Sequence, residues 1–241
     1  MTPAPLDFGP FEVITFDCYG TLIDWETGLL AAYGAVLRAH GVEVGDDEIL
    51  ERHAAHETAI EAGPYKPYRE VLAAGLRGVC ADLGITIVPG GSEAATFSGS
   101  VGDWPAFPDT AAALAMLRER YRLGVITNCD DDLFAASNRR LGIAFDWVVT
   151  AEQVRAYKPD SRPFEVAFER IGVPRERILH VAQSLFHDHV PAARLGLSSV
   201  WIDRRHDRPG SGATPPVADA AQAATFPDLA SFARAATAGA G

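Results

Sequence analysis

The residues best suited to chemistry lie where predicted strands end. Residues 11–16 are rich in β-branched and aromatic side chains and predict a buried strand, and Asp17 follows it directly. A buried carboxylate stays ionised only when it is paired. Lys158 can supply that charge, and the hydroxyl group of Thr21 can donate a hydrogen bond. Such a carboxylate can attack an electrophilic carbon and form a covalent ester, which splits one difficult displacement into two easier steps.

Two further polar residues follow later strands. Thr127 ends the predicted strand 123–127, and the predicted strand 178–182 leads to Asp188. In parallel α/β sheets, ligands bind beyond the carboxyl ends of the strands, so we expect both residues to converge on Asp17. We predict that Thr127 donates a hydrogen bond there. Asp188 is a candidate for positioning or deprotonating water, and it could also cap the helix that follows.

The rest of the chain must position these residues. From residue 109 onward, predicted strands alternate with helices of about a dozen residues, a pattern that implies βαβ units and a parallel sheet. The last predicted helix spans 226–236. Helical spacing predicts an earlier group of helices, and the Gly-, Ser- and Pro-rich stretch 89–109 predicts a connector. The helical ranges are 26–40, 46–62 and 66–84.

A helical insert explains why the first strand lies so far in sequence from the others. We therefore predict an α/β fold with a Rossmann-like parallel sheet and an inserted helical cap domain. Residues 1–21 and 101–241 are assigned to the core domain, and residues 22–100 to the cap.

The order of these pieces resembles the haloacid dehalogenase superfamily. Its motifs are an Asp nucleophile followed by Gly-Thr, a Ser or Thr after the second strand, a Lys and an acidic motif. Here Asp17, Thr127, Lys158 and Asp188 stand in the corresponding places, and the resemblance covers about 11–203.

The residue two positions after the nucleophile separates subclasses of this superfamily. Phosphatases carry a second Asp there, which protonates the leaving alcohol, whereas the type II 2-haloacid dehalogenases carry a Tyr, and this chain has Tyr19. A halide needs no proton, while ester hydrolysis gains about 10²–10⁴-fold from a general acid. The resemblance thus implies a hydrolase that cleaves carbon–halogen bonds of 2-haloacids through an ester on Asp17 and releases 2-hydroxy acids.

The resemblance also implies roles for residues outside the motifs. The cap is expected to place an arginine near the halogen; Arg52 is the best match by position and Arg69 the second. Backbone N–H groups of Tyr19 and Asn128 are expected to hold the substrate carboxylate. The remaining predicted substrate-binding residues are Tyr65, Tyr68, Phe164 and Gln183. The two tyrosines could equally well only pack the cap, and the dehalogenases carry Tyr and Ser at the last two positions, so the substrate is left open.

Three other functions remain to be weighed. The first is a phosphatase of the same superfamily, and the second is a related hydrolase that displaces another leaving group from a small 2-substituted carboxylate. The third, a catalytically silent binding protein, is opposed by the set Asp17, Thr127 and Lys158.

We expect no obligatory metal or other cofactor. Asp17 and Asp188 alone make a thin magnesium shell, although one or two carboxylates with waters can hold this ion.

Composition limits the partners. The 241 residues carry 21 Lys and Arg against 32 Asp and Glu, a net charge of −11, which opposes nucleic-acid binding. No apolar run is long enough to span a bilayer. Three cysteines without a CxxC motif favour a reducing, cytoplasmic location. We expect a small carboxylate substrate and no membrane partner, and the resemblance allows a homodimer.

Overall fold

A computed structural model describes residues 6–208, 210, 212–217 and 220–238. The chain forms a six-stranded sheet in the order β3-β2-β1-β4-β5-β6, and every pairing is parallel. The strands are β1 (Val13–Phe16), β2 (Arg122–Thr127), β3 (Trp147–Thr150), β4 (Ile178–Ala182), β5 (Ser198–Ile202) and β6 (Ala224–Phe226). The predicted α/β class and parallel sheet are confirmed.

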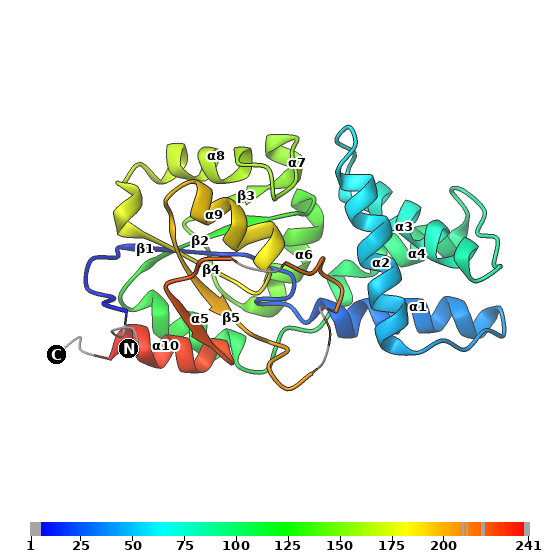
Figure 1. Cartoon of the computed structure of the whole chain (residues 1–241), viewed down its shortest axis with the longest axis horizontal. Coiled ribbons are helices and arrows are strands. Elements are labelled where there is room, and N and C mark those ends of the chain that lie inside the picture. The colour runs from blue at the N-terminus through cyan, green and yellow to red at the C-terminus, as the bar shows by residue number, and fades with distance from the viewer. Residues whose placement is uncertain (1–5, 209, 211, 218–219, 239–241) are drawn as a thin grey trace.

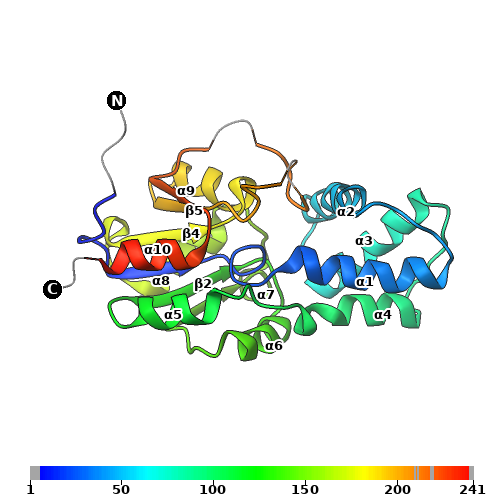
Figure 2. The same cartoon turned by 90° about the horizontal axis from the view of Figure 1, so that it is seen from below.

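Helices cover both faces of this sheet (Figures 1 and 2). Successive side chains of a strand point to opposite faces. Val13 therefore packs with α8 and α9 on one face, whereas Ile14 joins the larger core that includes α5 and α10 on the other. The helices of this part are α5 (Thr110–Arg118), α6 (Asp131–Leu141), α7 (Ala151–Val154), α8 (Arg162–Ile171), α9 (Val190–Arg194) and α10 (Leu229–Thr237).

Four helices gather at the other end of the molecule, as Figure 1 shows. We call them the cap helices: α1 (Trp25–Ala39), α2 (Asp46–Glu61), α3 (Tyr68–Asp82) and α4 (Ser92–Gly99). Asp24 caps α1 by accepting a hydrogen bond from the Thr27 N–H at 3.2 Å, which satisfies a free backbone donor of the first turn. The domain boundaries at 21/22 and 100/101 stay a prediction, and residues 1–5 and 239–241 of the predicted core lie outside the described residues.

Two sequence-based assignments were wrong. The predicted connector 89–109 contains α4 and a short 3₁₀ helix at Ser100–Asp103. Although Gly and Ser are frequent in this segment, Phe97 and Val101 bury their apolar side chains and stabilise the two helices. The predicted helix 226–236 begins only at Leu229, and the segment before it forms β6 on the sheet edge. Among the described helices, none combines the length and apolarity that crossing a bilayer requires.

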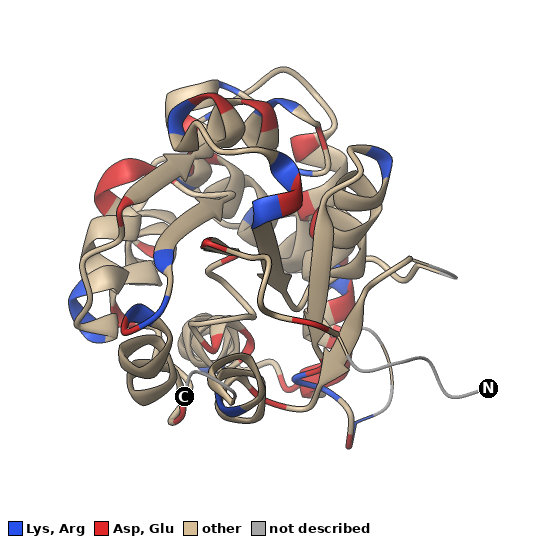
Figure 3. Cartoon of the chain, turned by 90° about the vertical axis from the view of Figure 1, so that its left-hand side faces the viewer, with Lys and Arg blue, Asp and Glu red and all other residues tan. Residues whose placement is uncertain are grey.

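Figure 3 shows Asp and Glu interspersed with Lys and Arg along the helices of the visible side. On this side the two signs of charge are therefore mixed rather than gathered in blocks of one sign. This visible side shows no block of basic residues of the kind that binds nucleic-acid phosphates.

Candidate active site

Asp17 lies immediately after β1, at the carboxyl edge of the sheet, with 6% of its surface exposed. Its Oδ2 accepts a hydrogen bond from the Thr21 hydroxyl at 2.7 Å, and its Oδ1 accepts one from Lys158 Nζ at 2.9 Å. The loop can return so tightly because Gly20 adopts φ +90°, a conformation that other residues rarely adopt. Thr21 Oγ1 also accepts a hydrogen bond from the Gln183 N–H at 2.9 Å, which fixes its position under the carboxylate.

Lys158 connects the two carboxylates of the site. Its ammonium, 1% exposed, donates to Asp17 Oδ1, to Asp188 Oδ1 at 2.6 Å and to the Ile126 carbonyl at 2.9 Å. Asn128 holds the Lys158 backbone from both sides, since its Oδ1 accepts from the Lys158 N–H at 2.7 Å and its Nδ2 donates to the Lys158 carbonyl at 3.0 Å. Ile126 near the end of β2 and Asn128 just after it thus hold the Lys158 side chain and backbone in position.

The charges of this trio follow from their contacts. Burial opposes the ammonium, but Asp17 and Asp188 outweigh it and raise the pKa of Lys158. For Asp188, burial is likewise outweighed, here by Lys158 and His180, and its pKa is lowered well below the usual value. For Asp17, burial and the charge of Asp188 outweigh Lys158 and Thr21, and its pKa is raised above 3.8. One ammonium between two carboxylates therefore favours Asp188 as the first to ionise.

A second row of polar side chains lies behind Asp188. His180 Nε2 lies 3.0 Å from Asp188 Oδ1, and its Nδ1 lies 2.9 Å from the Thr15 hydroxyl. All three residues are almost fully buried. This support was not predicted from the sequence, where its only signal was a histidine and a threonine within otherwise apolar strands. Asp188 Oδ2 has no hydrogen-bond partner among the described residues.

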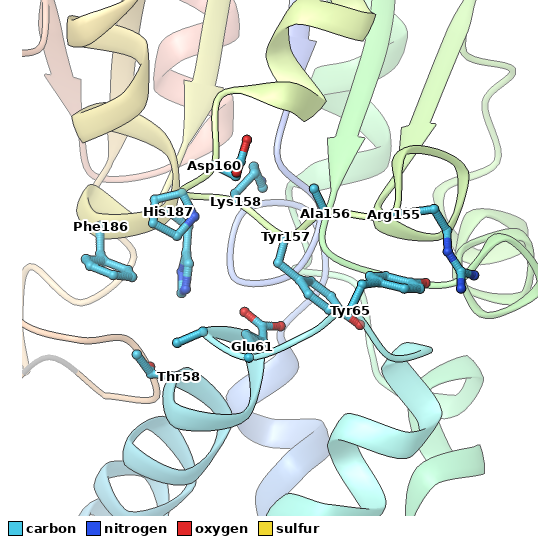
Figure 4. Close-up of a pocket in the computed structure, with 13 residues that line it drawn as sticks. Thr58, Glu61, Tyr65, Arg155, Ala156, Tyr157, Lys158, Asp160, Phe186 and His187 are labelled. Atoms are coloured by element: carbon cyan, nitrogen blue, oxygen red, sulfur yellow. The ribbon is translucent and has the colours of Figure 1, made fainter.

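A small inner pocket of about 40 Å³ gives access to Asp17. The core contributes Asp17, Tyr19, Asn128, Lys158, Ser184, His187, Asp188 and Thr214, and the cap helices contribute Trp25, Glu57, Glu61 and Tyr68. A larger vestibule of about 430 Å³ shares Glu61, Lys158 and His187 with it. In Figure 4, Glu61 points from the end of α2 toward the core, and His187 points from the core toward the cap.

Of the predicted residues, Tyr19, Tyr68 and Asn128 line the inner pocket. Tyr65 lines the vestibule, where its ring stacks on Tyr157 with centroids 5.4 Å apart. Thr127 is 2% exposed and its hydroxyl has no partner within the described part of the chain. Gln183 contributes its backbone N–H to Thr21, while its side-chain oxygen is buried and unpartnered among described atoms.

Arg52 does not reach the pocket, contrary to the sequence-based expectation. It donates to Glu48 Oε1 at 2.7 Å and lies 3.5 Å from Asp82, with about a third of its side chain exposed. The reason is helical rotation at 100° per residue. Glu57 and Glu61 face the pocket, and Arg52 stands about 140° around α2 from Glu57.

Two more predicted residues lie elsewhere. The Arg69 side chain, 42% exposed, pairs with Asp132 on the surface, and its backbone N–H donates to Asp130 at 3.1 Å. Phe164 is fully buried between α8 and the sheet, with its ring centroid 5.2 Å from that of His180. Phe164 is therefore a core residue rather than part of the pocket wall.

Most of the pocket residues that the cap helices contribute were not predicted from the sequence. Glu57 and Glu61 are spaced by four residues on α2, which was the available signal for one helical face. Trp25 and Thr214 carry no local signal, because each reaches the pocket through tertiary packing.

A magnesium ion, used by phosphatases that share these motifs, fits the residues poorly. No three His, Cys, Asp or Glu side chains of the described residues are grouped as a metal site. Moreover, Lys158 Nζ contacts both Asp17 Oδ1 and Asp188 Oδ1, so one ammonium already balances part of their negative charge.

The chain is similar to known hydrolases in sequence and in fold. The family model of haloacid dehalogenase-like hydrolases matches residues 11–188. The (S)-2-haloacid dehalogenase of Pseudomonas putida is 28% identical, covering 80% of this chain and 85% of that relative. The crystal structure of the L-2-haloacid dehalogenase RSc1362 has a TM-score of 0.77 at 25% identity, covering 93% of this chain and 97% of that one. The structure of the L-2-haloacid dehalogenase from Xanthobacter autotrophicus has a TM-score of 0.76 at 19% identity, covering 93% of this chain and 97% of that one. This similarity shows a likeness of fold.

Proposed function

Because this chain belongs to the haloacid dehalogenase-like hydrolase family, we propose that it hydrolyses 2-haloacids to 2-hydroxy acids through an ester on Asp17. One observation carries the proposal. Asp17 is a buried carboxylate held by Lys158 and Thr21 at the wall of a pocket, and the residue two positions later is Tyr19 rather than an acid. The relatives named above act on this class of substrate.

In the first step, an Asp17 oxygen attacks the carbon that carries the halogen. A carbon–oxygen bond forms, the carbon–halogen bond breaks, and the halide leaves with its electron pair, so the configuration at carbon inverts. Lys158 keeps the carboxylate oriented, and burial removes the water that would otherwise solvate it. We expect the substrate carboxylate to be held by backbone N–H groups of Tyr19 and Asn128, which lie at the pocket.

In the second step, water attacks the carbonyl carbon of the Asp17 ester. The bond between that carbon and the ester oxygen breaks, and the 2-hydroxy acid leaves with this oxygen, which came from Asp17, and with one proton of the water. Asp17 keeps the water oxygen and is again a carboxylate, and the second proton passes to solvent. Asp188 lines the pocket with an oxygen that has no partner among the described residues, which supports a role in positioning or deprotonating this water. The bond from His180 keeps the Asp188 carboxylate fixed.

We propose that the reaction needs no metal. The contacts of Lys158 support this, because its ammonium already supplies a positive charge to both Asp17 and Asp188. A cytoplasmic location is also proposed, since Cys18, Cys80 and Cys129 are free and buried. A homodimer stays a prediction.

A single-turnover reaction in ¹⁸O water tests the mechanism. Enzyme in excess over 2-chloropropionate should release chloride in EDTA, and mass spectrometry should then find one ¹⁸O in the peptide containing Asp17. The Asp17→Asn variant is the control for both readouts. Label in the 2-hydroxy acid instead of the peptide would contradict the ester. Magnesium-dependent turnover of p-nitrophenyl phosphate without chloride release would favour a phosphatase.

A further inference from the structure

Two buried polar side chains stand directly behind Asp188. Thr15 on β1 and His180 on β4 are paired across these parallel strands, and the Thr15 hydroxyl lies 2.9 Å from His180 Nδ1. The other ring nitrogen, Nε2, lies 3.0 Å from Asp188 Oδ1. The Phe164 ring packs edge-on against the imidazole, with centroids 5.2 Å apart, so the imidazole is held by packing as well as by hydrogen bonds.

The direction of these hydrogen bonds follows from the chemistry of the groups. The Thr15 hydroxyl has no partner other than His180 Nδ1 among the described residues, so its hydrogen is donated to that nitrogen. The ring hydrogen then lies on Nε2, since the bond at one nitrogen fixes the tautomer. Nε2–H donates to Asp188 Oδ1, because a carboxylate can only accept. His180 is thus a neutral donor whose orientation is set by Thr15.

The bond from His180 decides which oxygen of Asp188 is left free. Oδ1 accepts from both His180 Nε2 and Lys158 Nζ, whereas Oδ2 has no partner among the described residues. A carboxylate turns easily about its last bond, and two donors on one oxygen restrain that rotation. The inner pocket of about 40 Å³ that Asp188 lines has room for a water molecule, which needs about 10–15 Å³. Oδ2 is therefore the oxygen that can accept a hydrogen bond from such a water.

The groups that hold Asp17 do not depend on this buried pair. The carboxylate of Asp17 accepts hydrogen bonds from Thr21 and Lys158. Within the described part of the chain, the hydrogen bonds of His180 go only to its strand partner and to Asp188. Loss of the imidazole would therefore leave Asp17 oriented and would let the carboxylate of Asp188 turn.

We propose that Thr15 and His180 are positioning residues for the second step of the reaction alone. They direct Asp188 Oδ2 at the water that hydrolyses the ester on Asp17, and they take no part in forming that ester. The inference rests on the proposed function and adds to it which step the buried pair serves. Because a misplaced group can cost about 10²-fold in rate, we expect loss of the imidazole to slow ester hydrolysis by about 10²-fold.

A single turnover of 2-chloropropionate measures the two steps separately. Chloride release reports the formation of the ester, and intact-protein mass spectrometry follows the ester itself as a gain of one carboxyethyl group. In His180→Phe, chloride should appear at a rate within about threefold of the wild type. The ester should persist about 10²-fold longer. Phenylalanine keeps an aromatic ring against Phe164, so this variant retains the ring packing.

A double variant tests the alternative that His180 serves stability only. His180→Phe by itself leaves the Thr15 hydroxyl buried without its partner, whereas adding Thr15→Val replaces both partners by apolar groups. The double variant should therefore unfold at a higher urea concentration than His180→Phe. Its ester should persist as long as that of the single variant, because stability is regained while the donor to Asp188 is still absent.

Two further variants are matched controls. His189 is a second buried histidine, next to Asp188 in the sequence, but its ring nitrogens bond to Ser199 and to the Ala182 carbonyl. His189→Phe should lower the urea midpoint and leave the ratio of the two rates unchanged. Thr15→Ser keeps the hydroxyl that orients the imidazole, so its ester should decay at the wild-type rate, whereas Thr15→Val alone should prolong it.

The inference and the proposed function fail in different ways. A wild-type ester lifetime in His180→Phe would overturn the inference, and so would an equal slowing of chloride release and ester hydrolysis. A wild-type enzyme that releases no chloride and forms no ester would overturn the proposed function, and the inference with it. Fast chloride release together with a long-lived ester in both His180 variants would support the inference.

Discussion

One oxygen of the Asp17 carboxylate lies 2.9 Å from the Lys158 ammonium, across 141 positions of sequence. The same ammonium lies 2.6 Å from Asp188. One cation thus pairs with two buried acids, so the orientation of Asp17, the proposed nucleophile, and that of Asp188, the proposed water-binding carboxylate, depend on a single side chain.

Replacing that side chain by Lys158→Met should leave two buried carboxylates without a counter-charge. We expect kcat/KM for halide release to fall by about 10²–10³-fold and the free energy of unfolding to fall by about 3–5 kcal/mol. Halide assays and urea unfolding measure the two effects. Lys66→Met, at the other lysine of the sequence, is the control and should change neither, because Lys66 is exposed. Wild-type halide release by Lys158→Met would refute the role of the ammonium.

The Asp17 carboxylate, the proposed nucleophile, should titrate at a higher pH than an ordinary aspartate. Asp17 must be ionised to attack, and burial together with Asp188 raises its pKa above 3.8. The single-turnover rate of halide release should therefore decline with falling pH along a limb whose midpoint lies above 3.8. In Asp188→Asn the midpoint should move to lower pH, because one neighbouring negative charge is gone. A midpoint at or below 3.8 in the wild type would contradict the assigned direction.

The same raised pKa has a consequence for stability. The folded state binds a proton on Asp17 more readily than the unfolded chain does, so the ionised carboxylate destabilises the fold at pH values above that pKa. Asp17→Asn should therefore unfold at a higher urea concentration than the wild type at pH 7, while being inactive. An unfolding midpoint below that of the wild type would contradict this direction.

The structure places Arg52 away from the pocket, whereas the sequence-based expectation placed it near the halogen. It pairs with Glu48 and Asp82 on the outer side of α2, away from the pocket. We expect Arg52→Ala to change kcat/KM for halide release by less than about twofold, as for other exposed positions. A loss of tenfold or more would return Arg52 to the leaving-group role that the family resemblance implied.

Tyr19 tests whether the leaving group needs a proton. Its hydroxyl lies 3.0 Å from Ser137 Oγ, and its ring packs edge-on against Trp104 with centroids 5.7 Å apart. Tyr19→Phe should keep kcat for 2-chloropropionate within about tenfold and cost about 1 kcal/mol of stability through the lost hydrogen bond. A general acid would instead be revealed by a loss of about 10²–10⁴-fold.

Much of the site around Asp17 could be predicted because it follows from the order of the strands. Asp17 ends a strand, and parallel strands bring their carboxyl ends to one edge whatever lies between them. Lys158 and Thr21 were therefore predicted beside Asp17 before any contact was known, and the contacts bear this proximity out. His180 was missed because a histidine in a buried strand reveals nothing about the neighbour that it faces.

The sequence by itself determined the parallel sheet, the place of Asp17 on it and the cation that faces it. Only the tertiary structure decided which face of α2 meets the core, and hence that Glu57 and Glu61 form the cap wall in place of Arg52. The physical reason is that helical periodicity fixes which side chains share a face, whereas the rotation of a helix about its axis is set by packing against partners distant in sequence.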